Sequence, residues 1–535
     1  MLQEYQQPDL PSQRELPSPE ISPAEKKDTS ATIATVRVAQ FAIEGAALFP
    51  QQRLQDLLRD LIGRDLNLTE LREAADRISS LYHAEGYPLA STFLPPQTVT
   101  DGTVKLIVVE GKYGEVRVQG SARLPDATVS NILSAQGIVS GNAITQPYIE
   151  RGLLILQSMP ATDATLSVQA GTAVGTSDVQ VEAKAKNLIS GELSYDNHTS
   201  RYIGAQRVTA KVNLNSPFGW SDQLNVRGTH AVDHDFVSAN YTFPLGYTGL
   251  KVGGGASYLD YHLCCDFSVL DWQGEMTTFN LNASYPLILS KQRKLFIGAA
   301  YFNRHLRDEA LGVEIDDRKI NAAQLLLDAA LSGSAETRIN LTVTAANLDL
   351  SDNAGDQAQD AAGARSEGGF WKIRGALQQR WPVSSSVWLD YQLRGQWASN
   401  NLEGSEKFLL GGQNGVRAYP VGEGAGDMGL LARVELGTIV PLPIPGKLAA
   451  SLFADAGTTW LHQSTFTGAL GAGQSNHYTL AGTGVALLWA LPYQLTAEAS
   501  AAVKVGSNDG RITGGSDADG RNNRARGWVS LRWDF

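Results

Sequence analysis

The stretch that decides the fold is Tyr493–Val505, which reads YQLTAEASAAVKV. Apolar residues hold one parity of this stretch, and most residues of the other parity are polar, including Glu498 and Lys504. A period of two is typical of a β-strand. The last segment, Gly527–Phe535 (GWVSLRWDF), alternates in the same way. Because charged residues share the less apolar face in many such strands, the pattern favours a barrel with lipid outside over a soluble sandwich.

Alternating stretches of this kind fill residues 188–535 and recur roughly every 20 residues. The connections between them alternate in length, as expected for short periplasmic turns and long outer loops. The short connections fall near residues 216–222, 246–249, 290–293, 333–336, 383–386, 441–447 and 491–493, and the long ones near 353–368, 399–428, 461–476 and 506–526. We count sixteen strands, and an even number places both ends of the barrel on one side of the membrane, as a periplasmic N-terminal module requires.

The composition excludes several classes of protein. The net charge of −11 argues against a nucleic-acid partner, which would need clustered lysines and arginines. No stretch approaches the ~20 consecutive apolar residues of a membrane helix, but a barrel strand needs only ~9–11 alternating residues. The first residues also lack the basic start and apolar run of a secretory signal. Since an outer-membrane barrel first crosses the inner membrane, we interpret Met1 as following a signal peptide that has been removed.

Residues 1–32 form a proline-rich segment with few large apolar side chains. Such a composition cannot bury enough surface to offset the entropy of ordering the chain, which favours a flexible linker. The alternative is a short plug helix in a pore, since Gln3–Gln7 can form one helical turn before Pro8 and Pro11 end it.

Residues 33–111 and 112–187 repeat one order of elements, β-α-α-β-β. In the first repeat the pattern predicts strands near Val36–Phe41, Ala90–Leu94 and Val104–Val109, and helices through Leu54–Leu61 and Leu71–Tyr82. Asn67, with Glu70 three residues later, is expected to cap the second helix. The second repeat predicts strands near Gly114–Gly120, Thr165–Gln169 and Val179–Lys186, and helices near Asp126–Ala135 and Gln146–Gln157.

Two motifs stand out within the predicted barrel. The longest outer loop, residues 399–429, contains the segment EKFLLGGQNGVRAYPVGEGAGDMG over residues 406–429. A later strand contains SLFADAGTTW over residues 451–460. Phe453, Asp455 and Gly457 share one parity in that strand, so they face the same side of the barrel wall.

These motifs resemble the two defining motifs of two-partner secretion transporters, the TpsB family, which is related to the BamA-type barrel insertases. The repeated β-α-α-β-β order resembles the POTRA domain, a periplasmic chaperone-like module. The resemblance spans residues 33–535. It implies a mostly β fold, namely a sixteen-stranded antiparallel transmembrane β-barrel at 188–535 preceded by two α+β POTRA domains at 33–111 and 112–187.

The resemblance also implies that the long outer loop folds back into the barrel and meets the wall. It assigns the loop motif to Gly411, Gly412, Val416, Arg417, Ala418 and Tyr419, and the wall motif to Phe453, Asp455 and Gly457. We expect Arg417 to pair with Asp455 in a bidentate contact, and Gly457 to let the loop backbone approach. The alternative is an ordinary pore-lining salt bridge. In the family this position more often carries Gly than the Ala418 of this chain, so the backbone conformation at Ala418 stays undecided. If φ were positive there, alanine would cost about 1 kcal/mol.

By resemblance, the protein is an outer-membrane pore that recognises and secretes a large partner exoprotein, TpsA, without ATP. The POTRA domains would bind the exoprotein's N-terminal secretion domain in the periplasm, the barrel would contact outer-membrane lipids, and assembly machinery would recognise Phe535. We expect a monomer. The alternative is a BamA-type insertase, which needs a weak seam between the first and last strands. Whether the exoprotein is an adhesin, a cytolysin, a growth-inhibition toxin or a haem-binding protein stays open.

The sequence predicts no enzymatic activity, no cofactor and no metal site. It contains neither H-E-x-x-H nor G-x-S-x-G. Asp509, Asp517 and Asp519 share an outer loop, but their spacing fits no EF-hand, which favours a solvated polar loop. Cys264 and Cys265 are adjacent, so their Cα atoms are ~3.8 Å apart. Because this separation lies below the usual disulfide range, we expect no unstrained bridge.

Overall fold

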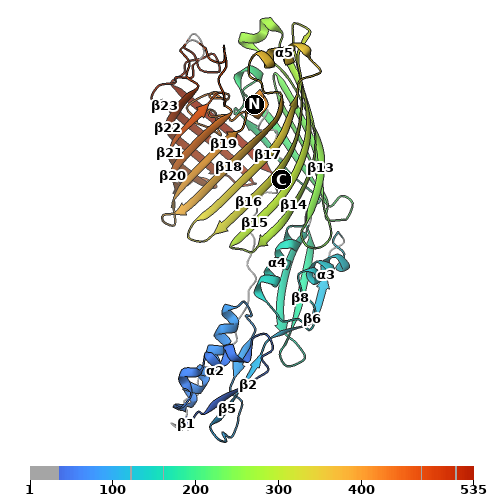
Figure 1. Ribbon diagram of the computed structural model, residues 1–535, viewed down its shortest axis with the longest axis vertical. Coiled ribbons are helices and arrows are strands. Elements are labelled where there is room, and N and C mark those ends of the chain that lie inside the picture. The colour runs from blue at the N-terminus through green and yellow to red at the C-terminus, as the bar shows by residue number, and fades with distance from the viewer. Residues whose placement is uncertain (1–34, 121–122, 161, 472, 512–514) are drawn as a thin grey trace. The chain divides into compact units, whose positions relative to one another are not determined.

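The computed structural model describes residues 35–120, 123–160, 162–471, 473–511 and 515–535. The choice between linker and plug for residues 1–32 therefore lies outside the described residues. The chain divides into two compact units, a β-barrel and a unit that holds both α+β repeats (Figure 1). No helix in the described part of the chain combines the length and apolar character needed to cross a bilayer.

The first repeat contains β1 (Thr35–Arg37), β2 (Gln40–Glu44), α1 (Gln51–Asp56), η2 (Arg59–Leu61), β3 (Asp65–Asn67), α2 (Leu68–Ala84), β4 (Ser91–Phe93) and β5 (Thr103–Val109). β2 runs parallel to β5, and β4 pairs antiparallel to the other side of β5. β1 and β3 form a separate two-stranded ribbon. The single strand predicted near Val36–Phe41 is thus split in two, because the chain leaves one sheet and enters another after Arg37.

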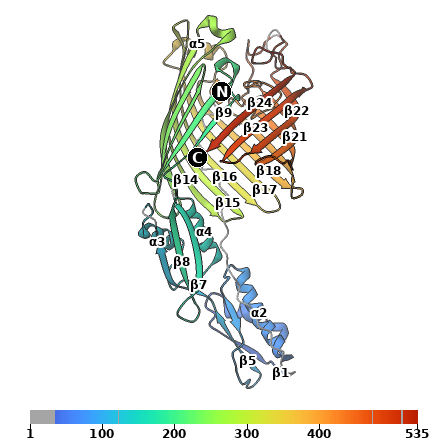
Figure 2. The same ribbon diagram turned by 180° about the vertical axis from the view of Figure 1, so that it is seen from behind.

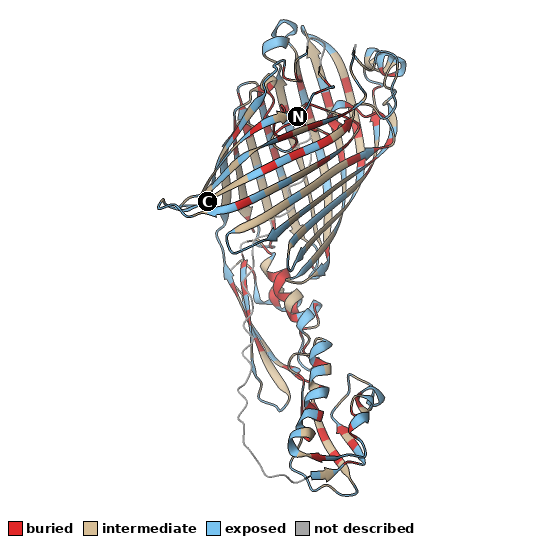
Figure 3. Cartoon of the chain, turned by 90° about the vertical axis from the view of Figure 1, so that its left-hand side faces the viewer, coloured by how far each residue is buried: buried red, intermediate tan, exposed pale blue. Residues whose placement is uncertain are grey.

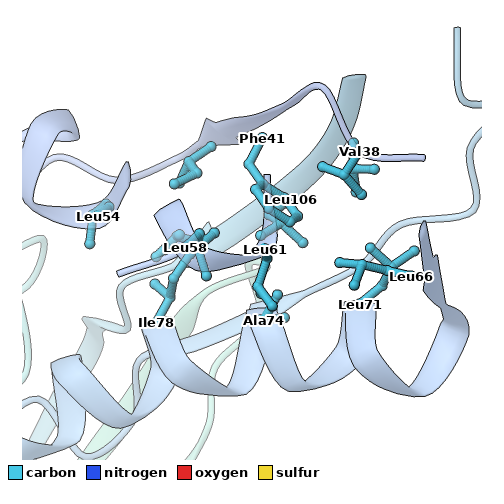
Figure 4. Packing of buried hydrophobic residues seen from close by; sticks show 14 of the residues in the cluster. Val38, Phe41, Leu54, Leu58, Leu61, Leu66, Leu71, Ala74, Ile78 and Leu106 are labelled. Carbon is cyan, nitrogen blue, oxygen red and sulfur yellow. The ribbon is translucent and has the colours of Figure 1, made fainter. Parts of the chain in front are cut away.

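The two helices of the first repeat pack their apolar faces on a common core (Figure 4). Asn67 and Glu70 form the predicted capping box at the start of α2. The prediction of one helix through Leu54–Leu61 is wrong, since α1 ends at Asp56 and a 3₁₀ turn, η2, follows. Leu54, Leu58 and Leu61 are nevertheless all buried, because tightening the last turn keeps them directed at the core.

A buried carboxylate closes the core of the first repeat. Glu110 Oε1 accepts hydrogen bonds from the backbone nitrogens of Ala47 and Leu48, both at 2.6 Å, and from the Tyr82 hydroxyl at 2.9 Å. Burial, together with the neighbouring Glu110 carboxylate, raises the pKa of the Tyr82 hydroxyl, so this group stays protonated and donates.

The second repeat contains β6 (Lys112–Gln119), α3 (Asp126–Ala135), α4 (Gln146–Gln157), β7 (Thr162–Ala170) and β8 (Thr176–Ala185). Its sheet order, β6-β8-β7, matches the order β2-β5-β4 of the first repeat. In both sheets the central strand is parallel to one neighbour: β5 to β2, and β8 to β6. The alternation predicted in the last strand is present, since Val179, Val181 and Ala183 are buried.

The barrel closes by pairing its last strand with its first (Figure 2). Its strands are β9 (Ile189–Asp196), β10 (Arg207–Asn215), β11 (Gln223–Ala231), β12 (His234–Pro244), β13 (Lys251–His262), β14 (Gln273–Leu289), β15 (Arg293–Ala310), β16 (Val313–Ser332), β17 (Glu336–Asp349), β18 (Gly368–Pro382), β19 (Val387–Ala398), β20 (Met428–Val440), β21 (Lys447–Trp460), β22 (His477–Ala490), β23 (Leu495–Val505) and β24 (Ala525–Asp534). The predicted count of sixteen antiparallel strands is confirmed.

Alternation along the strands sorts side chains between the two faces of the barrel. In the last segment Val529, Leu531, Trp533 and Phe535 are each 41–45% exposed, whereas Trp528, of the opposite parity, is 5% exposed. Buried apolar residues of the barrel form two clusters, one that includes Phe236, Leu348 and Leu402 and one that includes Leu410, Phe453 and Leu480. Figure 3 marks the buried residues of the barrel in red. Both clusters include residues of the long loops, Leu350 and Leu402 in the first and Phe408 and Leu410 in the second, so these loops cover part of the inner wall.

The four predicted long loops are present, but the predicted alternation is incomplete, because residues 232–233 and 311–312 are two-residue connections on the same side of the barrel as the long loops. One long loop carries a helix, α5 (Ala354–Ala362), and another is the motif loop, which ends at residue 427 rather than 429 because Met428 begins β20. Cys264 and Cys265 lie between β13 and β14, and their sulfur atoms are joined as a disulfide. A bridge between neighbours thus forms where the sequence analysis expected no unstrained one.

Candidate functional site

The long loop between β19 and β20, residues 399–427, folds against the inner wall of the barrel, and we call it the inserted loop. It doubles back on itself: Phe408 N donates to Gly426 O at 2.6 Å, and Gly411 N donates to Glu423 O at 2.8 Å. Its tip is tightly closed, since Val416 N donates to Leu410 O at 2.7 Å and Tyr419 N to Val416 O at 3.0 Å. Leu410, Val416, Ala418 and Tyr419 are fully buried.

Arg417, at the tip, meets Asp455 on β21. Its Nε and one terminal nitrogen donate to the two carboxylate oxygens of Asp455, both at 2.9 Å, and its backbone nitrogen donates to the same group at 3.1 Å. The guanidinium carbon lies 3.2 Å from the centre of the Phe453 ring. The side chains of Arg417 and Asp455 are 6% and 0% exposed, so their contact is almost free of water. Such a planar, bidentate fit fixes both the position and the direction of the tip.

Two charged residues on β20 extend this contact into a network that sequence reasoning missed. A terminal nitrogen of Arg417 also lies 3.0 Å from Glu435, and Arg433 Nε lies 3.3 Å from Asp455. Strand register explains the gathering, because β20 pairs with β21 so that Arg433 stands opposite Asp455. The parity of Arg433 and Glu435 within the predicted strand was the signal available, since both face the lumen.

The glycines of the two motifs provide the room that the loop needs. A Cβ atom on Gly457 would lie 2.5 Å from a methyl carbon of Leu410, and one on Gly411 would lie 2.5 Å from Pro420 O. Gly412 has a φ of 109°, a conformation that favours glycine. The loop backbone thus approaches the wall more closely than larger residues would permit.

Ala418 does not adopt a positive φ, so the strain considered for this position is absent. Its methyl group faces Gly482 on β22, where an added Cβ would lie only 2.6 Å from the Cβ of Ala418. The missing side chain at 482 therefore leaves the space that the alanine methyl occupies.

The last strand and the last outer loop also hold the inserted loop. Trp528 Nε1, on β24, donates to the backbone oxygen of Arg417 at 2.8 Å. Glu423, which is 1% exposed, accepts from Asn508 Nδ2 at 2.8 Å and from Ala518 N at 2.6 Å. The nearby Asp517 contacts Lys504 and lies 3.5 Å from Arg526. This aspartate is thus engaged with cations of the protein itself.

A cavity of about 540 Å³ lies beside the tip, lined in part by Arg417, Glu435, Glu498 and Trp528. Its lining is mixed acidic and basic, so it is polar enough to accommodate water. The site presents ion pairs that hold a segment in place rather than a nucleophile and base arranged for catalysis.

One group in the described part of the chain, His305, Asp317 and Asp352, brings three ligand atoms near one another. Asp317 Oδ2 already accepts from Arg307 Nε at 3.1 Å, and Asp352 is paired with Lys319. Because these cations compensate the carboxylates, we assign no metal here.

Comparison with known proteins places this architecture in a family. Residues 175–485 match the family described as haemolysin secretion/activation protein ShlB/FhaC/HecB, and residues 36–111 match the ShlB-type POTRA domain. The chain is 28% identical over 410 residues to the heme/hemopexin transporter protein HuxB of Haemophilus influenzae (strain 86-028NP), covering 76% of this chain and 72% of HuxB. It is 24% identical over 445 residues to the outer membrane transporter CdiB of Escherichia coli O6:K15:H31 (strain 536 / UPEC), covering 79% and 72%.

Among solved structures, CdiB from Escherichia coli is similar in fold, with a TM-score of 0.75 and 21% identity over 97% of this chain and 94% of CdiB. The family match spans more than half of the chain and includes both the inserted loop and its wall. The chain therefore belongs to the ShlB/FhaC/HecB family and is a two-partner secretion transporter, an outer-membrane β-barrel pore for a TpsA-type exoprotein and not an enzyme.

Proposed function

We propose that the tip of the inserted loop is a releasable lock of the secretion pore, with Arg417 and Asp455 as its contact. The observation that supports this most directly is the bidentate, nearly dry pairing of a loop arginine with a wall aspartate in the lumen. The loop occupies space that an unfolded exoprotein would cross, so it has to shift during transport. The adjoining polar cavity offers room in which water would solvate the separated charges.

The two repeats are proposed as the periplasmic receptor for the N-terminal secretion domain of the exoprotein. In each repeat a strand lies at a sheet edge, β4 in the first and β7 in the second. An extended segment can add to such an edge through backbone hydrogen bonds. Folding of the exoprotein outside the cell would then drive transport in the absence of ATP.

The barrel is proposed to lie in outer-membrane lipid as a monomer, and the barrel-assembly machinery is proposed to recognise Phe535. Phe535 is 41% exposed on the outward face, and its ring centre lies 5.2 Å from that of Trp533. An aromatic pair at this place suits the membrane interface and an external receptor alike.

The experiment that tests the lock is a secretion assay on Arg417→Ala, Asp455→Ala, the double variant and Arg417→Lys, at matched membrane levels. Removing one partner of a buried pair costs on the order of 3–5 kcal/mol, so both single variants should lose most secretion. Asp455→Ala should be the more severe, because it leaves Arg417 and Arg433 with Glu435 as their remaining partner in the network. The double variant should be little worse than the worse single, since the residues act as a pair.

Arg417→Lys should recover little, because an ammonium group lacks the planar fork that matches a carboxylate. Arg380→Ala is a suitable control. Arg380 on β18 pairs with Asp390 on β19, but its side chain is 51% exposed, so loss of this pair should cost little. Normal secretion by Arg417→Ala, or losses that simply add in the double variant, would contradict the proposed lock.

A further inference from the structure

The inserted loop is fastened at its base as well as at its tip. Glu406 is the last residue of the 3₁₀ turn η5 (Gly404–Glu406), which lies near the start of the inserted loop. Its side chain is 2% exposed. One carboxylate oxygen lies 2.6 Å from a terminal nitrogen of Arg304 on β15, and the other contacts Lys372 on β18. These two cations are 2% and 3% exposed. The base thus rests on a compact, dry group of one carboxylate and two cations.

A glutamine on β19 joins both arms of the loop at this level. Gln396 Nε2 donates to the backbone oxygens of Glu406 and Asp427, both at 3.0 Å. Asp427 is fully buried and accepts from Lys407 Nζ at 2.7 Å and from Leu402 N at 3.2 Å. The entering and leaving arms are therefore tied to each other and to the same part of the wall.

The base and the tip differ in their access to water. At the tip, Arg417 and Asp455 are themselves 6% and 0% exposed, but Glu435 and Arg433, which share their network, are 28% and 15% exposed and a cavity adjoins them. At the base, Glu406 and both cations that contact it are at most 3% exposed. Charges in a dry site attract more strongly and find no solvent to replace a lost partner. Separation of charges at the tip is therefore less costly than separation at the base.

We propose that Glu406 is the positioning residue that fixes the base of the inserted loop to β15 and β18, so that the loop moves about a stationary base. The segment from Phe408 to Gly426 would then leave the wall during transport while Gly404–Glu406 stays in place. This inference rests on the proposed function in so far as that function requires the tip to release.

Nitroxide labels at one tip residue and one base residue can test this arrangement. Asn414 is exposed at the tip, and a Cβ on Gly404 would meet no atom within 4 Å, so both sites accept a labelled cysteine. The labels are placed in the full chain with Cys264→Ser and Cys265→Ser and read in lipid vesicles by EPR. In Arg417→Ala the label at 414 should gain mobility while the label at 404 keeps the mobility that it has in the protein with an intact tip.

In Glu406→Gln the label at 404 should become mobile, and secretion should fall by about tenfold or more. Asp390→Asn is the matched control, because it also removes a lumen carboxylate paired with a cation but lies outside the loop, and both labels should stay as they are. Should Glu406→Gln fail to assemble, Lys372→Met removes one of the two cations instead and should mobilise the same label to a smaller extent.

The proposal would be overturned by an unchanged mobility of the label at 404 in Glu406→Gln, or by a gain in mobility at 404 together with 414 in Arg417→Ala. Normal secretion by Arg417→Ala would contradict the proposed function alone, because label mobility at 404 in Glu406→Gln reports on the base without reference to secretion.

Discussion

At the scale of single residues, the contact between Ala418 and Gly482 shows how the barrel wall accommodates a departure in a motif. The inserted loop carries a methyl group at Ala418, and β22 provides the space for it by having glycine at position 482. The two positions are 64 residues apart in sequence but form one packing unit. Their sizes are therefore expected to be coupled.

Gly482→Ala should destabilise the seated loop by about 1–3 kcal/mol through overpacking against Ala418. Adding Ala418→Gly should restore most of the loss, because the nearest remaining atom to the new methyl would be Val503 O at 3.3 Å. The measurement is secretion together with the temperature at which the barrel unfolds in detergent electrophoresis. Gly375→Ala serves as the control, since a Cβ there would meet no atom within 4 Å. A double variant as impaired as Gly482→Ala alone would show that the two positions are independent.

At the scale of elements, the pairing of β9 with β24, which closes the barrel, is shorter than the pairing of β9 with β10. Five residue pairs join these strands, from Ser530 to Asp534 on β24, whereas β9 and β10 are joined by eight. Beyond the last pair, Asn197 continues the connection through its side chain. Its Nδ2 donates to Gly527 O at 3.1 Å, and its Oδ1 accepts from Val529 N at 2.8 Å. The Asn197 side chain thus adds two hydrogen bonds to the one that its backbone nitrogen donates to Val529 O at 3.3 Å.

Asn197→Ala should lower the unfolding temperature of the barrel, because two hydrogen bonds worth about 1 kcal/mol each are lost at its shortest pairing. Asn225→Ala removes a side-chain hydrogen bond to Asn213 between β10 and β11, where the backbone ladder is longer, and should have a smaller effect. The measurement is again heat-modifiability of the purified protein. Equal shifts for the two variants would mean that the seam is no weaker than the rest of the wall.

At the scale of the whole molecule, the barrel and the pair of repeats are separate compact units. The first repeat has its own apolar core and its own buried carboxylate at Glu110, and the barrel closes through its own strand ladder. Each unit therefore has sheets of its own, since no strand of a repeat pairs with a described strand of the barrel. This independence predicts that binding of the exoprotein and formation of the pore can be separated by deletion.

Removal of residues 33–187 should abolish secretion and leave a barrel that still inserts and unfolds on heating, because closure of the barrel uses residues from Ile189 onward. Immunoblots of the membrane and of the culture medium measure the two properties in one experiment. Secretion at a normal level by the truncated barrel would contradict the proposed role of the repeats as the exoprotein receptor.

The amino-acid pattern by itself determined the fold class, the number of barrel strands, the positions of the four longest loops and the cap of α2. These features arise from interactions between residues near one another in the chain, where side-chain periodicity is a direct record of which face is buried. The break between α1 and η2 was not visible in this way, because a 3₁₀ turn keeps the same leucines on the core.

Only the tertiary structure decided which groups surround the inserted loop. The motifs suggested Arg417 and Asp455, and the structure brings them together, but it adds Glu435 and Arg433 to their network and fastens Glu406 to Arg304 and Lys372. Arg304 and Glu406 are 102 residues apart, and Trp528 reaches Arg417 across 111. No periodic pattern links such positions, because strand register and barrel closure, which are set by the sum of all pairings, determine which inward side chains meet.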